Sequence, residues 1–195
     1  MSWIVVGIVV AVALYVVSAY NGFVRLTQRT KEAWADIDVQ LKRRYDLIPN
    51  LIETVKGYAA HERGVFEEVT NARAKATQVH VDPSNITAEQ ITAMAGAESA
   101  LGASLGKLLA VAEAYPDLKA NQNFLDLQSQ LEGTENRINV ARQRYNESVQ
   151  GYNTYVRGFF RRMALSIFGG GEDFSVRKGF EAQQGADTAP VVKFQ

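Results

Sequence analysis

The first 24 residues contain no charged side chain, and this feature constrains the fold more than any other. All 21 lysines and arginines and all 21 aspartates and glutamates come later, and the first of them is Arg25. Residues 3–20 are apolar almost throughout and would span about 27 Å as a helix, or about 33 Å if the helix extends to residue 24. That length matches the hydrocarbon core of a bilayer. We therefore predict a transmembrane anchor over residues 1–24.

Two other interpretations of this run are weaker. A cleaved signal peptide fits the small residues at 17–19, but it needs a positively charged start and a shorter apolar run. A buried helix of a soluble protein is seldom this long and this apolar. The anchor is the better interpretation on both counts.

The charges next to the anchor predict its orientation. Only the chain terminus precedes the apolar run, whereas Arg25, Arg29 and Lys31 follow it closely. Positively charged flanks remain in the cytoplasm. We expect a single-pass protein with its N-terminus outside and its body in the cytoplasm.

The body shows helical periodicity and no long alternating pattern. Apolar residues recur at spacings of three, four and seven, and a heptad seam runs through residues 124–159. Thr87 and Gln90 form a capping box at the start of one helix. We predict an all-α fold: an N-terminal transmembrane helix, an antiparallel up-and-down four-helix bundle over residues 25–168, and a flexible tail over residues 169–195.

Pro49 admits two interpretations. A proline can occupy the first position of a new helix, or it can kink one long helix. The apolar face runs almost continuously through Pro49, which favours a kink. A turn would instead leave three helices of about 28 residues, matched in length for side-by-side packing. An even number of helices also returns the chain to the membrane, so we predict the turn.

Composition removes several classes of function. The absence of cysteine excludes disulfides, thiolate zinc sites and iron–sulfur clusters, and the zero net charge argues against nucleic-acid binding. His61 and Glu62 resemble the start of a zincin helix, but Val65 stands where the second histidine belongs. We predict no cofactor and no enzyme activity, with a metal-dependent factor using His61 and Glu62 as the alternative.

Charged residues at the far end of the first predicted helix of the body form a candidate docking surface. Arg43, Arg44 and Asp46 cluster with Lys42, and four exposed charges in one place suit a protein partner. An ordinary solvated helix end is an equally good interpretation.

Three asparagines repeat every seven residues in the last long helix. Asn139, Asn146 and Asn153 follow the heptad seam, although asparagine is unfavourable inside a helix. Hydrogen bonds that fix the register of the bundle are the favoured explanation, and a partner-binding face is the alternative.

Arginines that follow the apolar run and arginines near the end of the last long helix are candidate membrane contacts. Residues 137–162 contain six arginines and one acid, Glu147. A basic zone of this kind would be attracted to anionic lipid, unless its arginines are solvated or pair with acids of other helices. The candidate membrane-contact residues are Arg25, Arg29, Arg157, Arg161 and Arg162.

Two stretches show a family resemblance. IDVQLKRRYDLIPNLIETVKGYAAHE (residues 37–62) and ENRINVARQRYNESVQGYN (residues 135–153) resemble the two signatures of the LemA family. Tyr20-Asn21 after the apolar run and the C-terminal PVVKF are similar too. The resemblance implies a bacterial membrane protein with an antiparallel four-helix body and supports a turn at Pro49. It implies no reaction and no catalytic residues.

These features favour a membrane-anchored scaffold or adaptor. We expect membrane lipid and protein partners, or a second copy of the chain, to bind it. A magnetosome-associated branch of the family implies membrane organisation, and membrane proteases or stress-response proteins are further candidate partners. A lipid-binding, membrane-shaping protein is the third hypothesis.

Overall fold

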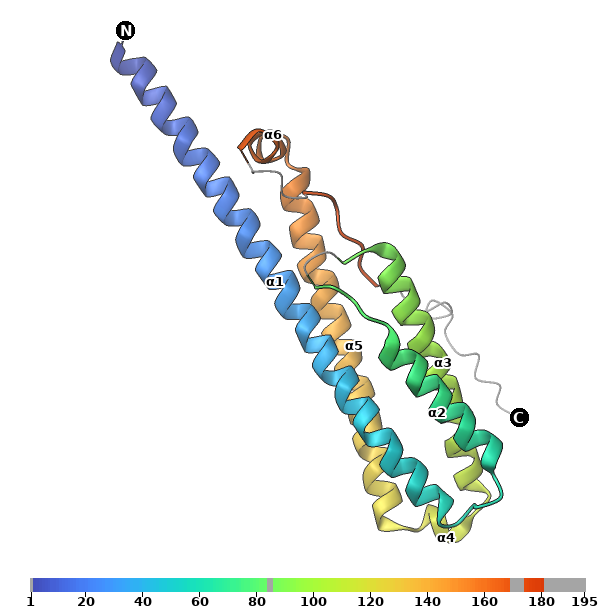
Figure 1. Ribbon diagram of the computed structural model, residues 1–195. Helices are drawn as coiled ribbons and strands as arrows, with labels where there is room; N and C mark the ends of the chain where they lie inside the picture. Colours follow the sequence, from blue (N-terminus) through green and yellow to red (C-terminus); the bar gives the residue numbers. More distant parts are fainter. Residues whose placement is uncertain (1, 84–85, 169–173, 181–195) are drawn as a thin grey trace, which may run out of the picture.

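A computed structural model describes residues 2–83, 86–168 and 174–180 (Figure 1). These residues form helices and connecting segments, with no β-strand among them. The all-α prediction is therefore confirmed. The helices are α1 (Ser2–Lys56), α2 (Arg63–Gln78), α3 (Ala88–Glu113), α4 (Pro116–Lys119), α5 (Gln122–Arg157) and α6 (Phe159–Phe168).

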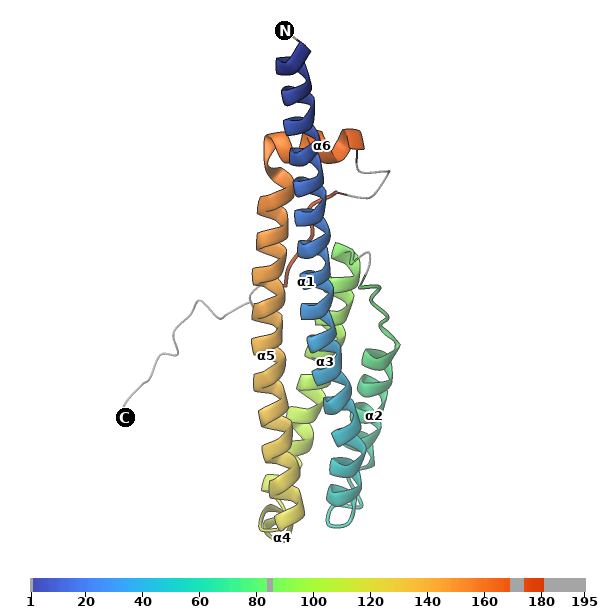
Figure 2. The ribbon, with the colours of Figure 1, turned by 90° about the vertical axis from the view of Figure 1, so that its left-hand side faces the viewer.

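Helix α1 contains both the apolar N-terminal run and a helix of the body. Its first part projects beyond every other helix (Figures 1 and 2). Large apolar side chains are bare there; Trp3 is 88% exposed and Ile4 is 70% exposed. Within the part of the chain that the structure describes, α1 is the one helix long and apolar enough to cross a membrane. The apolar N-terminal helix is confirmed, and exposed apolar side chains suit lipid as their surroundings.

The turn predicted at Pro49 is wrong, because α1 continues through this residue to Lys56. A proline inside a helix cannot donate a hydrogen bond to the carbonyl four residues earlier, here that of Tyr45. Arg73 of α2 replaces the missing donor, with its Nε 2.8 Å from the Tyr45 carbonyl oxygen. The apolar face also stays intact across the proline, and the chain reverses only at residues 57–62. The buried residues on this face are Ile48, Leu51, Ile52 and Val55.

This later reversal changes the predicted helix lengths. Helix α2 has 16 residues and α3 has 26, whereas α5 has 36. Helix α1 packs antiparallel along α5, and the shorter pair α2 and α3 packs beside the end of this pair that is distant from the N-terminus (Figures 1 and 2). The capping box predicted at α3 is present, with Gln90 N 3.2 Å from Thr87 Oγ1 and Thr87 N 3.0 Å from Gln90 Oε1.

The core consists of separate apolar clusters. The largest draws on α1, α2, α3, α4 and α5 at the end distant from the N-terminus, around fully buried residues such as Leu101 and Leu108. A second cluster surrounds Ile37 and Ile138. A small third cluster joins α1, α5 and α6 through Phe23, Tyr152, Val156 and Leu165. Gly22 permits close contact near this third cluster, because a Cβ there would lie 2.1 Å from the Tyr155 hydroxyl oxygen.

Candidate functional site

Arg44 lies inside the body, so its predicted place on an exposed docking surface is wrong. Its side chain is 8% exposed, and its Nη1 lies 3.0 Å from Glu98 Oε2 of α3 and 2.8 Å from Glu135 Oε2 of α5. Glu98 is itself only 4% exposed. The arginine is buried because two carboxylates from other helices compensate for its lost hydration. This ion cluster separates the two large apolar clusters of the core.

Tyr45 completes the ion cluster. Its hydroxyl donates a hydrogen bond to Glu98 Oε1, so both Glu98 oxygens have partners. Burial, followed by the hydrogen bond to Glu98, raises the pKa of Tyr45 well above its ordinary value. The tyrosine therefore stays protonated and remains a donor to the carboxylate. The remaining members of the predicted docking surface, Lys42, Arg43 and Asp46, are exposed on α1.

Two of the three predicted asparagines hold an extended segment of the chain against α5. Asn153 Nδ2 donates to the Arg177 carbonyl oxygen, and Arg177 N donates to Asn153 Oδ1, both at 2.8 Å. Asn146 binds Phe180 in the same way, at 3.0 Å to the carbonyl oxygen and 2.7 Å from the backbone nitrogen. Each amide thus satisfies both backbone groups of one residue. We call the surface of α5 and α1 that receives residues 174–180 the tail groove.

Helix and segment share a common spacing in the tail groove. Seven residues of α5 separate the two asparagines, a rise of about 10.5 Å. Three residues of the segment separate Arg177 from Phe180, and three extended residues span about 10 Å. The heptad repeat therefore matches a three-residue repeat of an extended chain. Asn139, one heptad further along α5, is exposed, and the described segment ends at Phe180, level with Asn146.

Aromatic side chains form the walls of the tail groove. The ring of Phe180 stacks on Trp34, with centroids 6.1 Å apart, and meets Tyr145 edge to face at 5.6 Å. Phe174 meets Phe23 edge to face at 4.6 Å. The tail was predicted to be flexible, but this description does not fit residues 174–180. The rest of the predicted tail, including PVVKF, lies outside the described residues.

Two further contacts complete the fit of the segment. The Arg177 guanidinium lies over the Tyr152 ring, 4.4 Å from its centroid, at a distance typical of a cation–π contact. A Cβ on Gly179 would lie 2.6 Å from Asn146 Oδ1. Only glycine fits at position 179 without displacing the asparagine that binds the next residue.

The tail groove predicts a loss of stability in alkali. Burial raises the pKa of Tyr145 from 10.0 to about 12, although Arg177 opposes the shift. Below pH 10 both the folded and the unfolded chain hold this proton, whereas between about pH 10 and 12 only the folded chain holds it. The free energy of unfolding should therefore fall by about 1.4 kcal/mol per pH unit in this window on account of Tyr145. Urea unfolding at several pH values should show a shallower fall for Tyr145→Phe, and an unchanged slope would contradict the assignment.

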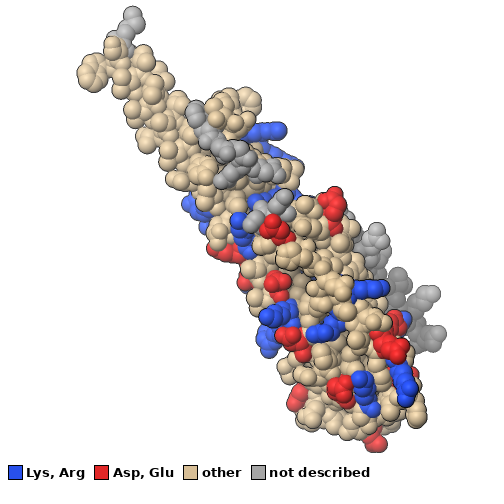
Figure 3. Space-filling model, in the orientation of Figure 1, with Lys and Arg blue, Asp and Glu red and all other residues tan. Residues whose placement is uncertain are grey.

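The predicted membrane-contact arginines lie towards one end of the body. The C-terminal part of α5 runs beside α1 where the projecting part of α1 begins, and the Tyr155 hydroxyl donates to the Ala19 carbonyl oxygen at 2.9 Å. Figure 3 shows the projecting part of α1 without charge and acidic and basic groups mixed over the body. The five predicted side chains are all exposed: Arg25, Arg29, Arg157, Arg161 and Arg162.

Helix α6 lies at the C-terminal end of α5 and crosses α1 below the projecting part of that helix (Figure 2). Ala164 and Leu165 are buried against the body, while Arg161 lies over the Tyr155 ring at 4.3 Å. The opposite face carries large exposed apolar side chains, of which Phe159 and Phe160 meet edge to face, with ring centroids 5.2 Å apart. These side chains are 75%, 65%, 48% and 66% exposed at Phe159, Phe160, Met163 and Ile167, respectively.

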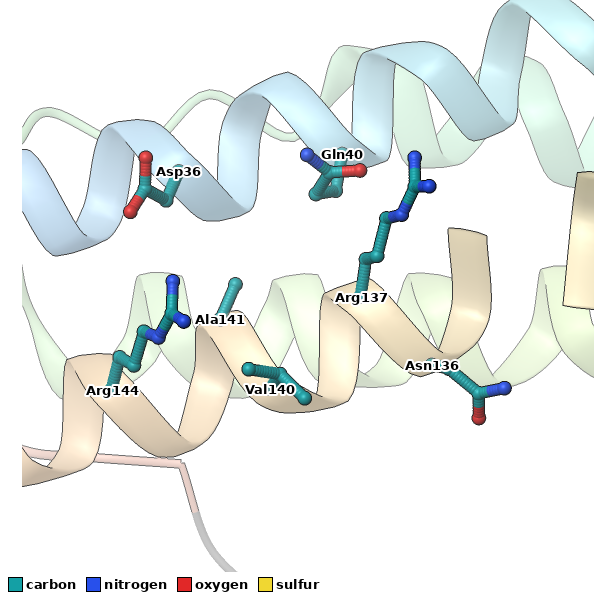
Figure 4. Close-up of a pocket in the computed structure, with 7 residues that line it drawn as sticks. All are labelled: Asp36, Gln40, Asn136, Arg137, Val140, Ala141 and Arg144. Carbon is teal, nitrogen blue, oxygen red and sulfur yellow. The ribbon is translucent and has the colours of Figure 1, made fainter. Parts of the chain in front are cut away.

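Two cavities in the described part of the chain lie along α1. One, of about 390 Å³, lies between α1 and α5 and is lined by Asp36, Arg137 and Arg144 among others (Figure 4). Another, of about 350 Å³, includes His80. His61 lies in the turn after α1, not on a helix, and is exposed. Among the residues that the structure describes, no three histidine, aspartate or glutamate side chains are grouped to hold a metal.

The fold and these surfaces define a membrane-associated, all-helical protein with one apolar N-terminal helix. The particular family follows from comparison with known proteins: the chain belongs to the LemA family, whose model matches residues 33–194. Similar curated proteins are Magnetosome protein MamQ 2 and Magnetosome protein MamQ 1 of Paramagnetospirillum magneticum. Each is 26% identical over 155 residues, covering 71% of this chain and 57% of the relative.

A third relative is Magnetosome protein MamQ of Magnetospirillum gryphiswaldense. It is 25% identical over 146 residues, covering 66% of this chain and 54% of the relative. The chain thus spans a little over half the length of the curated relatives it matches. The family and the relatives support a membrane-associated helical protein whose biochemical function is not established.

Proposed function

We propose that this protein is a membrane-anchored scaffold that holds its helical body at a fixed position above the bilayer and binds other proteins or further copies of itself. The observation that carries this proposal is the continuity of α1. One helix of 55 residues supplies the apolar run and the longest contact in the body, with no linker between them. A flexible tether would suit an enzyme that searches for substrate, whereas an unbroken helix fixes a surface in place.

The relatives fit this role. Three of them are named as magnetosome proteins, and the matches cover 66–71% of this chain. We propose that the body lies in the cytoplasm, since the arginines that follow the apolar run favour that side.

Chemical crosslinking in native membranes tests the scaffold. A lysine-reactive reagent should yield a reproducible adduct of the chain with a second copy or with another membrane protein. The alanine variants of His61 and Glu62 should give the same adduct, because the scaffold does not use the metal chemistry suggested for them. A chain that stays uncrosslinked at its native abundance, although exposed lysines such as Lys107 are available, would contradict the proposal.

A second proposal concerns lipid, and the exposed face of α6 favours it. Four large apolar side chains of α6 are exposed beside the base of the projecting part of α1, and Arg161 and Arg162 lie between them in the sequence. This is the arrangement of a helix lying in the plane of a bilayer surface. Helix α6 would give the anchored body a second contact with the membrane.

Tryptophan quenching by brominated lipid tests this contact. We start from the full chain with Trp3→Phe, in which buried Trp34 of the body is the remaining tryptophan. Adding Met163→Trp on α6 should give strong quenching in vesicles, because the new ring would lie among the lipid chains. The matched control is Leu125→Trp, an exposed position at the other end of α5. Equal quenching at positions 163 and 125 would contradict a membrane contact for α6.

A further inference from the structure

The tail groove recognises a peptide through its main chain. The two asparagine amides satisfy the N–H and C=O groups of Arg177 and Phe180. These four hydrogen bonds do for an extended peptide what a neighbouring strand does in a sheet. They require an extended backbone, and no particular side chain.

Selectivity comes from the side chains that face the groove. Phe174, Arg177 and Phe180 contact aromatic rings of α1 and α5, whereas Ser175 and Val176 are exposed. Gly179 is required by the close approach of Asn146. The groove thus selects the pattern Phe-x-x-Arg-x-Gly-Phe, in which x marks the exposed positions.

The same pattern is available from every copy of the chain. Residues 174–180 lie outside any helix, and three consecutive glycines, residues 169–171, precede them in the sequence. Because α1 joins body and membrane segment without a break, anchored copies hold their grooves and their segments at matching heights. Confinement of the copies to one membrane raises the effective concentration of the segment of one copy around the tail groove of another.

We propose that the tail groove of one copy binds residues 174–180 of a second copy, so that anchored chains are linked by exchange of this segment. The inference rests on the proposed scaffold function and names its partner. Exchange of an identical element between protomers replaces each intramolecular contact by the same contact between chains. When residues 174–180 bind the tail groove of their own chain, the same contacts form within a single copy.

Two complementary variants of the full chain test the exchange. The first, the groove variant, carries Asn146→Ala and Asn153→Ala, and it keeps an intact segment. The second, the tail variant, carries Phe174→Ala and Phe180→Ala, and it keeps an intact groove. Alanine favours helix more than asparagine does, so α5 is preserved in the groove variant. Circular dichroism of each protein checks that the helices are retained.

The two variants carry different affinity tags and are reconstituted separately and together in phosphatidylglycerol–phosphatidylethanolamine vesicles. Neither variant alone has both halves of the contact, so neither should co-purify with its own kind. Mixed together, the segment of the groove variant should enter the groove of the tail variant, and co-purification should rise about tenfold or more over either alone. The matched control pairs the tail variant with a chain carrying Asn136→Ala, an exposed asparagine of α5 outside the groove, and this pair should also associate.

The possible outcomes separate this inference from the scaffold proposal. If native chains associate but the mixed variants do not, exchange is overturned and the scaffold uses another surface. If each variant alone associates as well as the mixture does, the segment is again not the link. If native chains do not associate in these vesicles, exchange is overturned, while crosslinking to a different protein in native membranes would still support the scaffold.

Discussion

Replacing Arg44 with alanine should lower the free energy of unfolding by about 3–5 kcal/mol. The guanidinium group faces Glu98, whose side chain is 4% exposed, and Glu135, whose side chain is 39% exposed. Removing the arginine leaves a buried carboxylate without its cation and opens a space between the two large apolar clusters. The loss is the cost of the uncompensated charge more than the strength of the ion pair itself.

Urea unfolding of the full chain in detergent, followed by circular dichroism, measures this effect. Arg43→Ala is the matched control, since its side chain is the next in sequence and is exposed, and it should change stability by less than about 0.5 kcal/mol. The double variant Arg44→Met with Glu98→Leu should recover most of the loss, because an apolar pair removes both charges. A single Arg44→Ala variant as stable as the Arg43→Ala variant would show that the buried cluster is unimportant.

Replacing Trp34 with alanine should cost about 3–5 kcal/mol, the range for a large aromatic residue in a core. Trp34 is 5% exposed and contacts both Tyr145 of α5 and Phe180 of the segment. Its loss should also free the segment, because the ring forms the wall on which Phe180 stacks. Limited trypsin digestion should then cut after Arg177 or Lys178 faster than in the native chain, before the helices unfold.

A double-mutant cycle separates the two roles of Trp34. Phe180→Ala alone should release the segment while leaving the second apolar cluster largely intact. Combined with Trp34→Ala, the two changes should be non-additive by about 0.5–1.5 kcal/mol, the usual coupling of an aromatic pair. Additive losses would mean that the two rings do not stabilise each other, and unchanged trypsin cleavage in both variants would contradict the tail groove.

The sequence predicted the helical class and the apolar N-terminal helix well, because both depend on local composition and periodicity. It also contained the evidence that Arg44 is buried. Ile37, Leu41, Arg44 and Ile48 fall at helical spacing on one face, so the arginine is placed among core residues. The prediction of an exposed cluster relied on charges adjacent in the sequence. Adjacent residues on a helix point in different directions, so Arg44 can be buried while Arg43 is exposed.

The error at Pro49 has a different cause. A proline within a helix is costly unless the carbonyl group it leaves unpaired finds another donor. Here the donor is Arg73, which lies on a different helix. Local sequence patterns do not predict a contact between residues of two helices. The tail groove was also missed, because an extended segment of seven residues has no periodicity to match against a helix. The heptad spacing of the asparagines is recognisable in the sequence, but the backbone groups that Asn146 and Asn153 bind are not.

Because α1 is unbroken, a change in the tilt of its apolar part also tilts the body of the protein. About 32 residues of this helix follow residue 24, a length of about 48 Å. A tilt of about 20°, common for membrane-spanning helices, would move the far end of the body sideways by about 16 Å. For the membrane-spanning α1 that we propose, a bilayer thinner than the apolar run would increase the tilt of the helix, so the position of the distal end of the body would depend on the thickness of the membrane. Inserting one residue after the span would also turn the whole body by about 100° around the helix axis.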